Sequence, residues 1–313
     1  MKTFFLLTLF FFSIPTFSQV QRTDGLIEIT KNLTGEFAYP KFSNDGTKIF
    51  FSTPNYKGIY QFDLVRNKLD RLTYDDGAGY EFIISNDNGT IFFRNNRFIN
   101  NLKFSSLISL NLKTRKINVI ESDKRELYPP ILLKNGNIAY VLESKVFTLD
   151  RNLKKRLAKD GTQDVFVFLR DSKIVLLING VERLLTPNGE GHYIWPSLSP
   201  DKTQLLFTHA GVGTFITDLN GKIISNLGYA NYPRWSPDGN WVLYMNDKDD
   251  GKHLLSSDIW AISLADKRRI QLTDTKDQIE MFADWSPDGK KIVYNTNDGK
   301  IFLLNIENML GVK

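Results

Sequence analysis

The side chains best suited to metal binding or proton transfer are three histidines that lie far apart in the sequence. His192, His209 and His253 are the only imidazoles, and the chain has no cysteine. Without thiols, the chain can form neither a thiolate metal site nor a cysteine nucleophile. Ligands from distant repeats can share one metal, so the spacing alone leaves a histidine site open. Single loop histidines are the commoner case, and we expect neither a metal nor another cofactor.

Other patterns that would indicate chemistry are missing. The acidic segment 246–251 has neither the alternate ligand spacing of a calcium-binding EF-hand loop nor its final glutamate, and a solvated hairpin loop explains it better. The chain contains no Gly-x-Ser-x-Gly nucleophile elbow and no glycine pattern of a dinucleotide or phosphate loop. We therefore predict no catalytic residue.

A turn motif recurs along the chain and would position any site. Tyr-Pro-Arg-Trp-Ser-Pro-Asp-Gly at 232–239 has a near copy, Phe-Ala-Asp-Trp-Ser-Pro-Asp-Gly, at 282–289. Weaker copies lie at 39–46, 84–89, 128–136 and 195–201. The proline presets φ, the aspartate can accept hydrogen bonds from following backbone amides, and the glycine allows positive φ. The aspartate of each motif is therefore interpreted as structural.

Each motif is followed by runs of β-branched and aromatic residues that predict short strands, for example at 48–52, 241–244 and 291–294. Four such strands returning about every 40 residues are typical of β-propeller blades. The expected fold class is an all-β, single closed β-propeller with seven blades. Six blades remain possible, because 159–191 supplies only three strands.

The two ends of the repeat array complement each other. The segment 26–34 resembles a fourth strand with no blade before it, whereas the last blade ends after its third strand, near Ile306. We predict that the N-terminal strand completes the last blade and closes the ring, which removes exposed sheet edges. The propeller would then be one domain, residues 19–313.

Residues 1–18 have the pattern of a secretory signal peptide. Lys2 precedes an apolar run from Phe4 to Phe12, and small residues follow at Thr16 and Ser18. The run is about half of the roughly 20 apolar residues that a spanning helix needs, and no later segment is long enough. The mature chain is expected to be periplasmic or secreted, without a membrane span. The net charge of +5 is spread without long basic runs, which argues against a nucleic-acid partner.

Two features resemble the TolB-type propeller repeat. They are the sequence motif at 232–239 with its near copy at 282–289, and the Leu-Thr strand endings at 72–73, 185–186 and 272–273. This repeat also occurs in tricorn-type and prolyl-oligopeptidase-type propellers. The resemblance extends over about 26–306. It implies a periplasmic or secreted propeller used as a binding platform.

In a propeller, the loops that lead into the first strand of each blade meet at one mouth of the central channel. Their mixture of aromatic and charged residues suits recognition of a protein or carbohydrate. The candidate binding residues at this mouth are Glu36, Tyr39, Lys41, Tyr80, Glu81, His192, Tyr193, Tyr232, Arg234, Glu280 and Asp284. Loop decoration and interblade packing by the tyrosines would explain the same residues without a binding role.

The main prediction is a non-enzymatic, monomeric propeller that binds a protein, a cell-envelope component or a glycan through this mouth. The alternative is a propeller polysaccharide lyase or hydrolase that uses channel acids such as Glu81 and Glu280 together with a divalent metal. A third hypothesis is an accessory subunit that functions only within an assembly.

Overall fold

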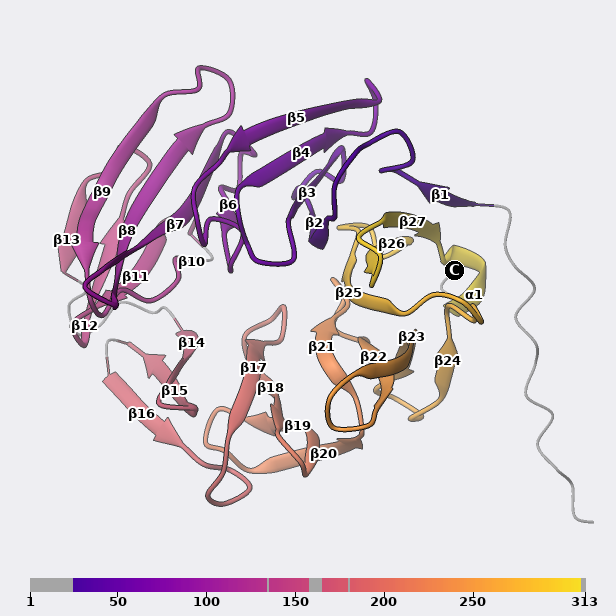
Figure 1. Ribbon diagram of the computed structural model, residues 1–313. Coiled ribbons are helices and arrows are strands. Elements are labelled where there is room, and N and C mark those ends of the chain that lie inside the picture. The colour runs from indigo at the N-terminus through magenta and orange to yellow at the C-terminus, as the bar shows by residue number, and fades with distance from the viewer. Residues whose placement is uncertain (1–24, 134, 158–164, 180, 311–313) are drawn as a thin grey trace, which may run out of the picture.

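The computed structural model describes residues 25–133, 135–157, 165–179 and 181–310 (Figure 1). The predicted signal peptide, residues 1–18, lies outside the described residues. The strands form seven antiparallel sheets arranged around a ring, so the expected propeller with seven blades is confirmed. No helix in the described ranges is long and apolar enough to cross a membrane.

Blades 1 to 3 each have four strands. Blade 1 contains β2 (Ala38–Phe42), β3 (Lys48–Ser52), β4 (Ile59–Asp63) and β5 (Lys68–Thr73). Blade 2 contains β6 (Ile83–Ile84), β7 (Thr90–Ile99), β8 (Leu102–Asn111) and β9 (Ile117–Lys124). Blade 3 contains β10 (Ile131–Leu132), β11 (Ile138–Leu142), β12 (Lys145–Leu149) and β13 (Lys155–Leu157).

Blade 4 has three described strands, β14 (Val165–Arg170), β15 (Lys173–Ile178) and β16 (Val181–Leu185). Blade 5 contains β17 (Tyr193–Leu198), β18 (Gln204–His209), β19 (Gly213–Asp218) and β20 (Ile223–Gly228). Blade 6 contains β21 (Asn231–Trp235), β22 (Trp241–Asp249), β23 (Leu254–Ser263) and β24 (Arg269–Gln271). Blade 7 contains β25 (Glu280–Trp285), β26 (Lys291–Thr296) and β27 (Ile301–Asn305), and the helix α1 (Glu307–Leu310) follows.

The strand β1 (Leu26–Glu28) pairs antiparallel with β27 and gives blade 7 its fourth strand. Beyond β1, Ile29 N donates to Ile301 O at 2.9 Å, and Ile301 N donates to Thr30 Oγ1 at 2.9 Å. The N-terminal segment thus sits on the last blade, as the sequence suggests. That this strand is what holds the ring closed stays a prediction.

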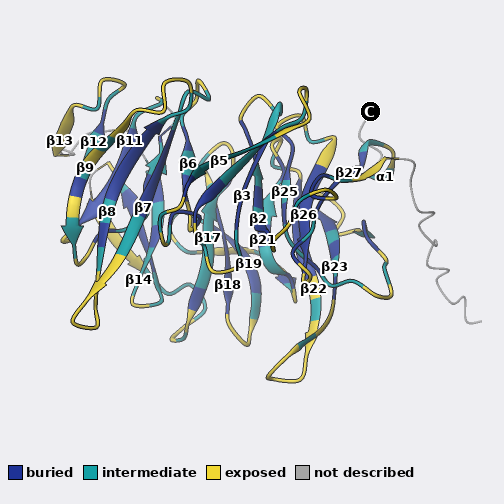
Figure 2. Cartoon of the chain, turned by 45° about the horizontal axis from the view of Figure 1, so that its top comes forward, coloured by how far each residue is buried: buried dark blue, intermediate teal, exposed yellow. Residues whose placement is uncertain are grey.

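The apolar core is divided among the boundaries between blades. Seven clusters of buried side chains each join two neighbouring blades. At the boundary where the two ends of the ring meet, Ile49 and Phe51 of blade 1 pack with Val293 and Leu303 of blade 7. The buried side chains lie mainly on the strands within the blades, and exposed residues concentrate in hairpins and outer strands (Figure 2).

The repeated turn motif has the structural role predicted for it. Asp238 Oδ1 accepts hydrogen bonds from Ser236 Oγ at 2.6 Å and from Asn240 N at 3.0 Å, and Ser236 Oγ in turn accepts one from Trp241 N at 2.9 Å. The same serine–aspartate bond recurs in blades 1, 2, 5 and 7. These aspartates therefore fix the entry into each second strand.

Candidate functional site

The first strands of several blades carry a β-bulge where they face the axis of the ring. The strands β2, β17, β21 and β25 lie closest to the centre of the ring, and each shifts register against the second strand of its blade (Figure 1). Each bulge contains one aromatic residue at positive φ: Tyr39, Trp195, Tyr232 and Phe282, with φ between 50° and 57°. Positive φ is uncommon for residues other than glycine. Bulges of this kind redirect side chains near functional sites.

These bulge residues belong to a continuous series of aromatic contacts, here called the aromatic arc. Tyr39 stacks on Tyr56 at 4.3 Å between ring centroids and contacts Phe282 at 4.5 Å. The rings of Phe282 and Tyr232 meet edge-on with their centroids 4.9 Å apart. The Tyr232 ring in turn meets the Trp195 ring edge-on, with centroids 5.8 Å apart. At the other end Tyr80 meets Tyr56 edge-on at 5.1 Å. The aromatic arc is Tyr80, Tyr56, Tyr39, Phe282, Tyr232 and Trp195.

Two residues after the positive-φ aromatic residue of the bulge, blades 1, 6 and 7 each carry a charged side chain. These three residues are here called the channel charge cluster: Lys41, Arg234 and Asp284. Lys41 Nζ donates to Phe82 O at 2.9 Å, and Asp284 Oδ2 accepts from Phe42 N at 3.1 Å. Lys41 and Asp284 both line a cavity of about 360 Å³.

Arg234 extends from the channel charge cluster to the aromatic arc. Its Nη2 donates to Tyr232 Oη at 2.5 Å, and its guanidinium lies 4.3 Å from the centroid of the same ring. Arg234 O accepts a bond from Trp285 Nε1 at 3.2 Å. A charged hydrogen bond at one end and a tryptophan contact at the other therefore fix this arginine.

The channel charge cluster changes the acidity of its own members. Burial lowers the pKa of Lys41; Asp284 raises it and Arg234 lowers it further. Burial raises the pKa of Asp284, against the opposing effect of Arg234 and Lys41. A lysine with a lowered pKa can give up its proton and act as a base. The fixed guanidinium can meanwhile pair with a carboxylate.

A second positive group lies at the blade 2 end of the aromatic arc. Arg94 is 7% exposed, donates from Nη1 to Leu127 O at 2.7 Å, and has its guanidinium 5.5 Å from the Tyr80 ring centroid. Burial and the neighbouring Glu81 raise the pKa of Tyr80 to about 12. Arg94 and Tyr56 were not predicted, because they come from a second strand and from the hairpin after one. Both lie outside the loops before first strands, from which the sequence predicted the mouth residues.

The structure brings seven of the predicted residues together and separates four. Tyr39, Lys41, Tyr80, Tyr232, Arg234 and Asp284 are in the two groups above, and Glu81 adjoins Tyr80 at positive φ in the corresponding position of blade 2. Glu36 and His192 are exposed in loops without a described side-chain hydrogen bond or ion pair. Tyr193 is fully buried, stacks on His209 at 4.7 Å and donates to Gly189 O at 2.6 Å. It is a packing residue.

Glu280 is fully buried at the start of β25 instead of lying on the mouth surface. Its Oε1 accepts a bond from Thr275 Oγ1, while Oε2 has no hydrogen-bond partner among the described residues. Burial, opposed by Thr275 and reinforced by Asp258 and Asp274, raises the pKa of Glu280 to about 7. Glu280 is therefore a buried carboxyl group whose neighbours are also acidic.

The described side chains do not form a donor set for a metal ion. No group of three or more histidine, cysteine, aspartate or glutamate side chains comes together in the described part of the chain. His209 is buried against Tyr193, and His253 lies in an exposed hairpin beside Asp250. The channel charge cluster contributes the Arg234 guanidinium, whose positive charge repels a divalent ion. The arrangement is better suited to an anion than to a metal.

Comparison with known proteins gives a structural likeness only. No family model and no curated protein sequence matches the chain. A solved structure of an oligogalacturonate lyase from Vibrio parahaemolyticus aligns with 91% of this chain and 94% of its own, with a TM-score of 0.61 and 13% identity. A second solved structure, an oligogalacturonate lyase in complex with manganese, covers 85% of this chain and 76% of its own, with a TM-score of 0.49 and 14% identity. At these identities the likeness establishes the propeller fold alone.

The main functional prediction from the sequence, a non-enzymatic binding scaffold, is contradicted. The Vibrio propeller, which matches this chain over nearly its whole length, is described as a lyase. The alternative prediction is a propeller polysaccharide lyase or hydrolase that uses channel acids and a divalent metal. The part of that alternative that requires a divalent metal has no donor set among the described residues.

Proposed function

We propose that this protein is an enzyme that cleaves an acidic oligosaccharide by elimination within the propeller channel. The observation that carries the proposal is the position of the channel charge cluster directly beside the aromatic arc. Sugar rings stack on aromatic faces, and a uronate carboxylate requires a cation. The description of the Vibrio propeller as an oligogalacturonate lyase supports the same substrate class.

Elimination from a uronate requires a base, a cation for the carboxylate and an acid for the leaving group. A base removes the proton on the carbon next to the carboxylate, a carbon–carbon double bond forms, and the glycosidic carbon–oxygen bond breaks. The leaving oxygen takes up a proton, and no water is consumed. Removal of the first proton places charge on the carboxylate, so a fixed cation at that position stabilises the transition state.

The described residues can fill these three roles. Lys41, whose pKa burial lowers, is the base in its neutral form. Arg234 pairs with the carboxylate of the substrate. Tyr232 accepts a bond from Arg234 at 2.5 Å, which leaves its own O–H free to donate to the leaving oxygen. Asp284 acts on Lys41 electrostatically. No step requires a metal.

The experiment uses the chain without its first 18 residues and a panel of acidic and neutral oligosaccharides. Turnover is followed by the ultraviolet absorbance of the unsaturated uronate product. We expect turnover of acidic substrates only, with K41Q and R234Q each reducing kcat/KM by at least about 100-fold. K113Q, which changes an exposed lysine outside the channel, serves as the matched control. Equal turnover by K41Q and K113Q would rule out Lys41 as the base.

Export from the cytoplasm is also part of the proposal. The predicted signal peptide supports it, and extracytoplasmic polysaccharide is the substrate that an exported lyase would meet. A fusion of residues 1–18 to a reporter enzyme that is active only outside the cytoplasm tests this directly. Activity of the fusion is expected, and a silent fusion would contradict export.

A further inference from the structure

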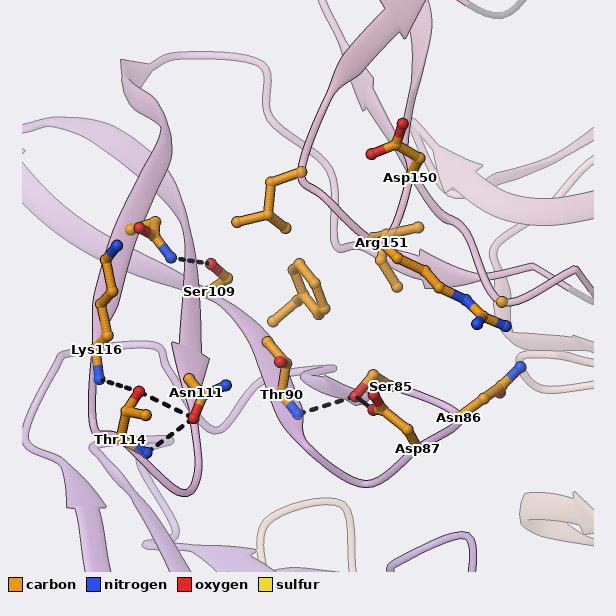
Figure 3. A pocket seen from close by; sticks show the side chains of 15 residues that line it. Ser85, Asn86, Asp87, Thr90, Ser109, Asn111, Thr114, Lys116, Asp150 and Arg151 are labelled. Carbon is orange, nitrogen blue, oxygen red and sulfur yellow. Dashed lines mark hydrogen bonds between the residues drawn. The ribbon is translucent and has the colours of Figure 1, made fainter.

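A second cavity lies away from the channel, between blades 2 and 3. It has a volume of about 480 Å³, within the size range of small-ligand sites. Its walls are the turn that includes Ser85 and Thr90, the outer hairpin that includes Asn111 and Lys116, and the blade 3 segments around Gly136 and Arg151 (Figure 3). No member of the channel charge cluster or the aromatic arc lines it. We call it the interblade cleft.

The interblade cleft lies beside a copy of the turn motif that lacks the proline. At three other boundaries, the turn proline covers the motif glycine of the next blade. A Cβ atom built on Gly239, Gly289 or Gly46 would lie 3.5–4.0 Å from Cδ of Pro200, Pro237 or Pro287, respectively.

In blade 2 the proline is replaced by Asn86, which faces Gly136 in the same way. Blade 1 also has an asparagine here, but Asn44 Nδ2 donates to Ser85 O at 2.9 Å. The Asn86 side chain has no such bond among the described residues, so its amide is available to a ligand (Figure 3).

Two cations stand on opposite walls of the interblade cleft. Lys116 belongs to the blade 2 hairpin and Arg151 to the blade 3 turn (Figure 3). Neither side chain forms an ion pair or a hydrogen bond within the described parts of the chain. Arg151 is close enough to Asp87 to help lower the pKa of that carboxyl, without an ion pair. These cations are the free charges of the cleft.

The two carboxylates of the interblade cleft are already engaged in their own turns. Asp87 Oδ1 accepts from Ser85 Oγ at 2.6 Å and from Gly89 N at 3.0 Å. Asp150 Oδ1 accepts from Asn152 N at 2.9 Å and from Lys154 N at 3.0 Å. Hydrogen bonds of this kind fix a carboxylate in place and satisfy much of its acceptor capacity. A ligand therefore meets the cationic groups of this cleft more readily than the anionic ones.

The rest of the lining combines apolar and neutral polar groups. Phe92, Ile138 and Leu153 provide apolar surface, and Thr90 and Asn118 provide a hydroxyl and an amide. An apolar face bordered by hydroxyl and amide groups matches a sugar ring, whose C–H face is apolar and whose edge carries hydroxyls. The two cations add a preference for a carboxylate.

We infer that the interblade cleft is a binding site for a small hydroxylated carboxylate of the hexuronate class. The inference stands on the cleft alone and does not depend on catalysis in the channel. It makes the protein a molecule with two separate sites for acidic sugars, one in the channel and one between blades 2 and 3.

The experiment measures binding of monomeric galacturonate by titration calorimetry, with galactose and inorganic phosphate as comparison probes. We expect saturable galacturonate binding, which the double variant K116Q/R151Q weakens at least tenfold. The titrations are made in the R234Q background, so that the channel does not contribute, and K113Q on the surface leaves this binding unchanged. Absence of galacturonate binding, or binding that K116Q/R151Q does not weaken, would overturn the inference. Galactose binding as tight as galacturonate, or equally tight phosphate, would overturn the ligand class.

A second variant tests the cleft without changing its charge. Asn86→Pro restores the residue that the motif carries in blades 5 to 7, and Asn86 N donates no described backbone bond. The variant is expected to fold with an unchanged melting temperature and to weaken galacturonate binding several-fold. Unchanged binding in this variant would show that Asn86 is not part of the site. Channel turnover by the same variant separates failure of this site from failure of the proposed function.

Discussion

At the scale of single residues, the channel charge cluster connects three blades that are far apart in the sequence. Lys41, Arg234 and Asp284 each lie two residues after the positive-φ residue of a bulge, so the same backbone geometry places all three. The sequence indicates these residues as candidates, because they lie in the segments that lead into the first strands of the blades. It could not show that they share one environment, because that depends on the closure of the ring.

Asp284 sets the acidity of the proposed base. Its charge raises the pKa of Lys41, so Asp284→Asn should lower that pKa and move the ascending limb of the pH profile of kcat/KM to lower pH. Asparagine can still accept the bond from Phe42 N, which preserves the local fold. A pH profile of the variant checks this expectation. A limb that stays in place or moves to higher pH would contradict the role given to Lys41.

Glu280 is expected to make the stability of the fold depend on pH. Its folded-state pKa of about 7 lies above the ordinary value of 4.5, so its stabilising contribution is complete below about pH 4.5 and is lost as the pH rises through 7. Glu280→Gln should therefore raise the free energy of unfolding by about 1–2 kcal/mol at pH 8 relative to pH 5. Denaturant unfolding of both proteins at the two pH values measures this difference. A constant difference would show that Glu280 does not titrate in this range.

At the scale of elements, the motif tryptophans tie the channel strands of neighbouring blades together. Trp285 Nε1 donates to Arg234 O at 3.2 Å, and Trp235 Nε1 donates to Ser197 O at 3.4 Å. Nothing in the sequence indicates that these tryptophans fix the backbone of channel residues. The bulges were not predicted either, because no pattern in the sequence indicates that an aromatic residue adopts positive φ.

These two tryptophans form a matched pair for a test. Trp285→Phe and Trp235→Phe each remove one hydrogen bond and some packing, and each should cost about 1–3 kcal/mol of unfolding free energy. Only Trp285→Phe loosens the backbone of Arg234, so only this variant should also raise KM for an acidic substrate. Thermal unfolding and steady-state kinetics measure the two effects. An equal rise in KM for both variants would indicate a general loss of stability instead.

At the scale of the whole molecule, the sequence predicted the propeller, its seven blades and the short fourth blade, because copies of the turn motif mark six of the blades and 159–191 supplies only three strands. The main functional prediction from the sequence was wrong, because function depends on which side chains meet across blades. The resemblance to TolB-type repeats and the leader stay predictions. Arg94 is an example of a site residue that the sequence does not reveal, since it reaches the aromatic arc from a second strand.

The N-terminal segment provides the test of ring closure. Deletion of residues 19–34 removes β1, Ile29 and the Thr30 bond to Ile301, and should cost about 3–5 kcal/mol of unfolding free energy. Deletion of residues 19–24 alone, which leaves β1 in place, is the control. Equal melting temperatures for the two truncated proteins would show that β1 does not hold the ring closed.

Mass spectrometry of the products is the most direct test of elimination in the channel. Elimination adds no water, so the account predicts that an acidic oligosaccharide yields one ordinary fragment and one unsaturated fragment whose masses together equal the mass of the substrate. Fragments that together carry one additional water would show hydrolysis, and an intact substrate would show no cleavage. Either result would contradict the account.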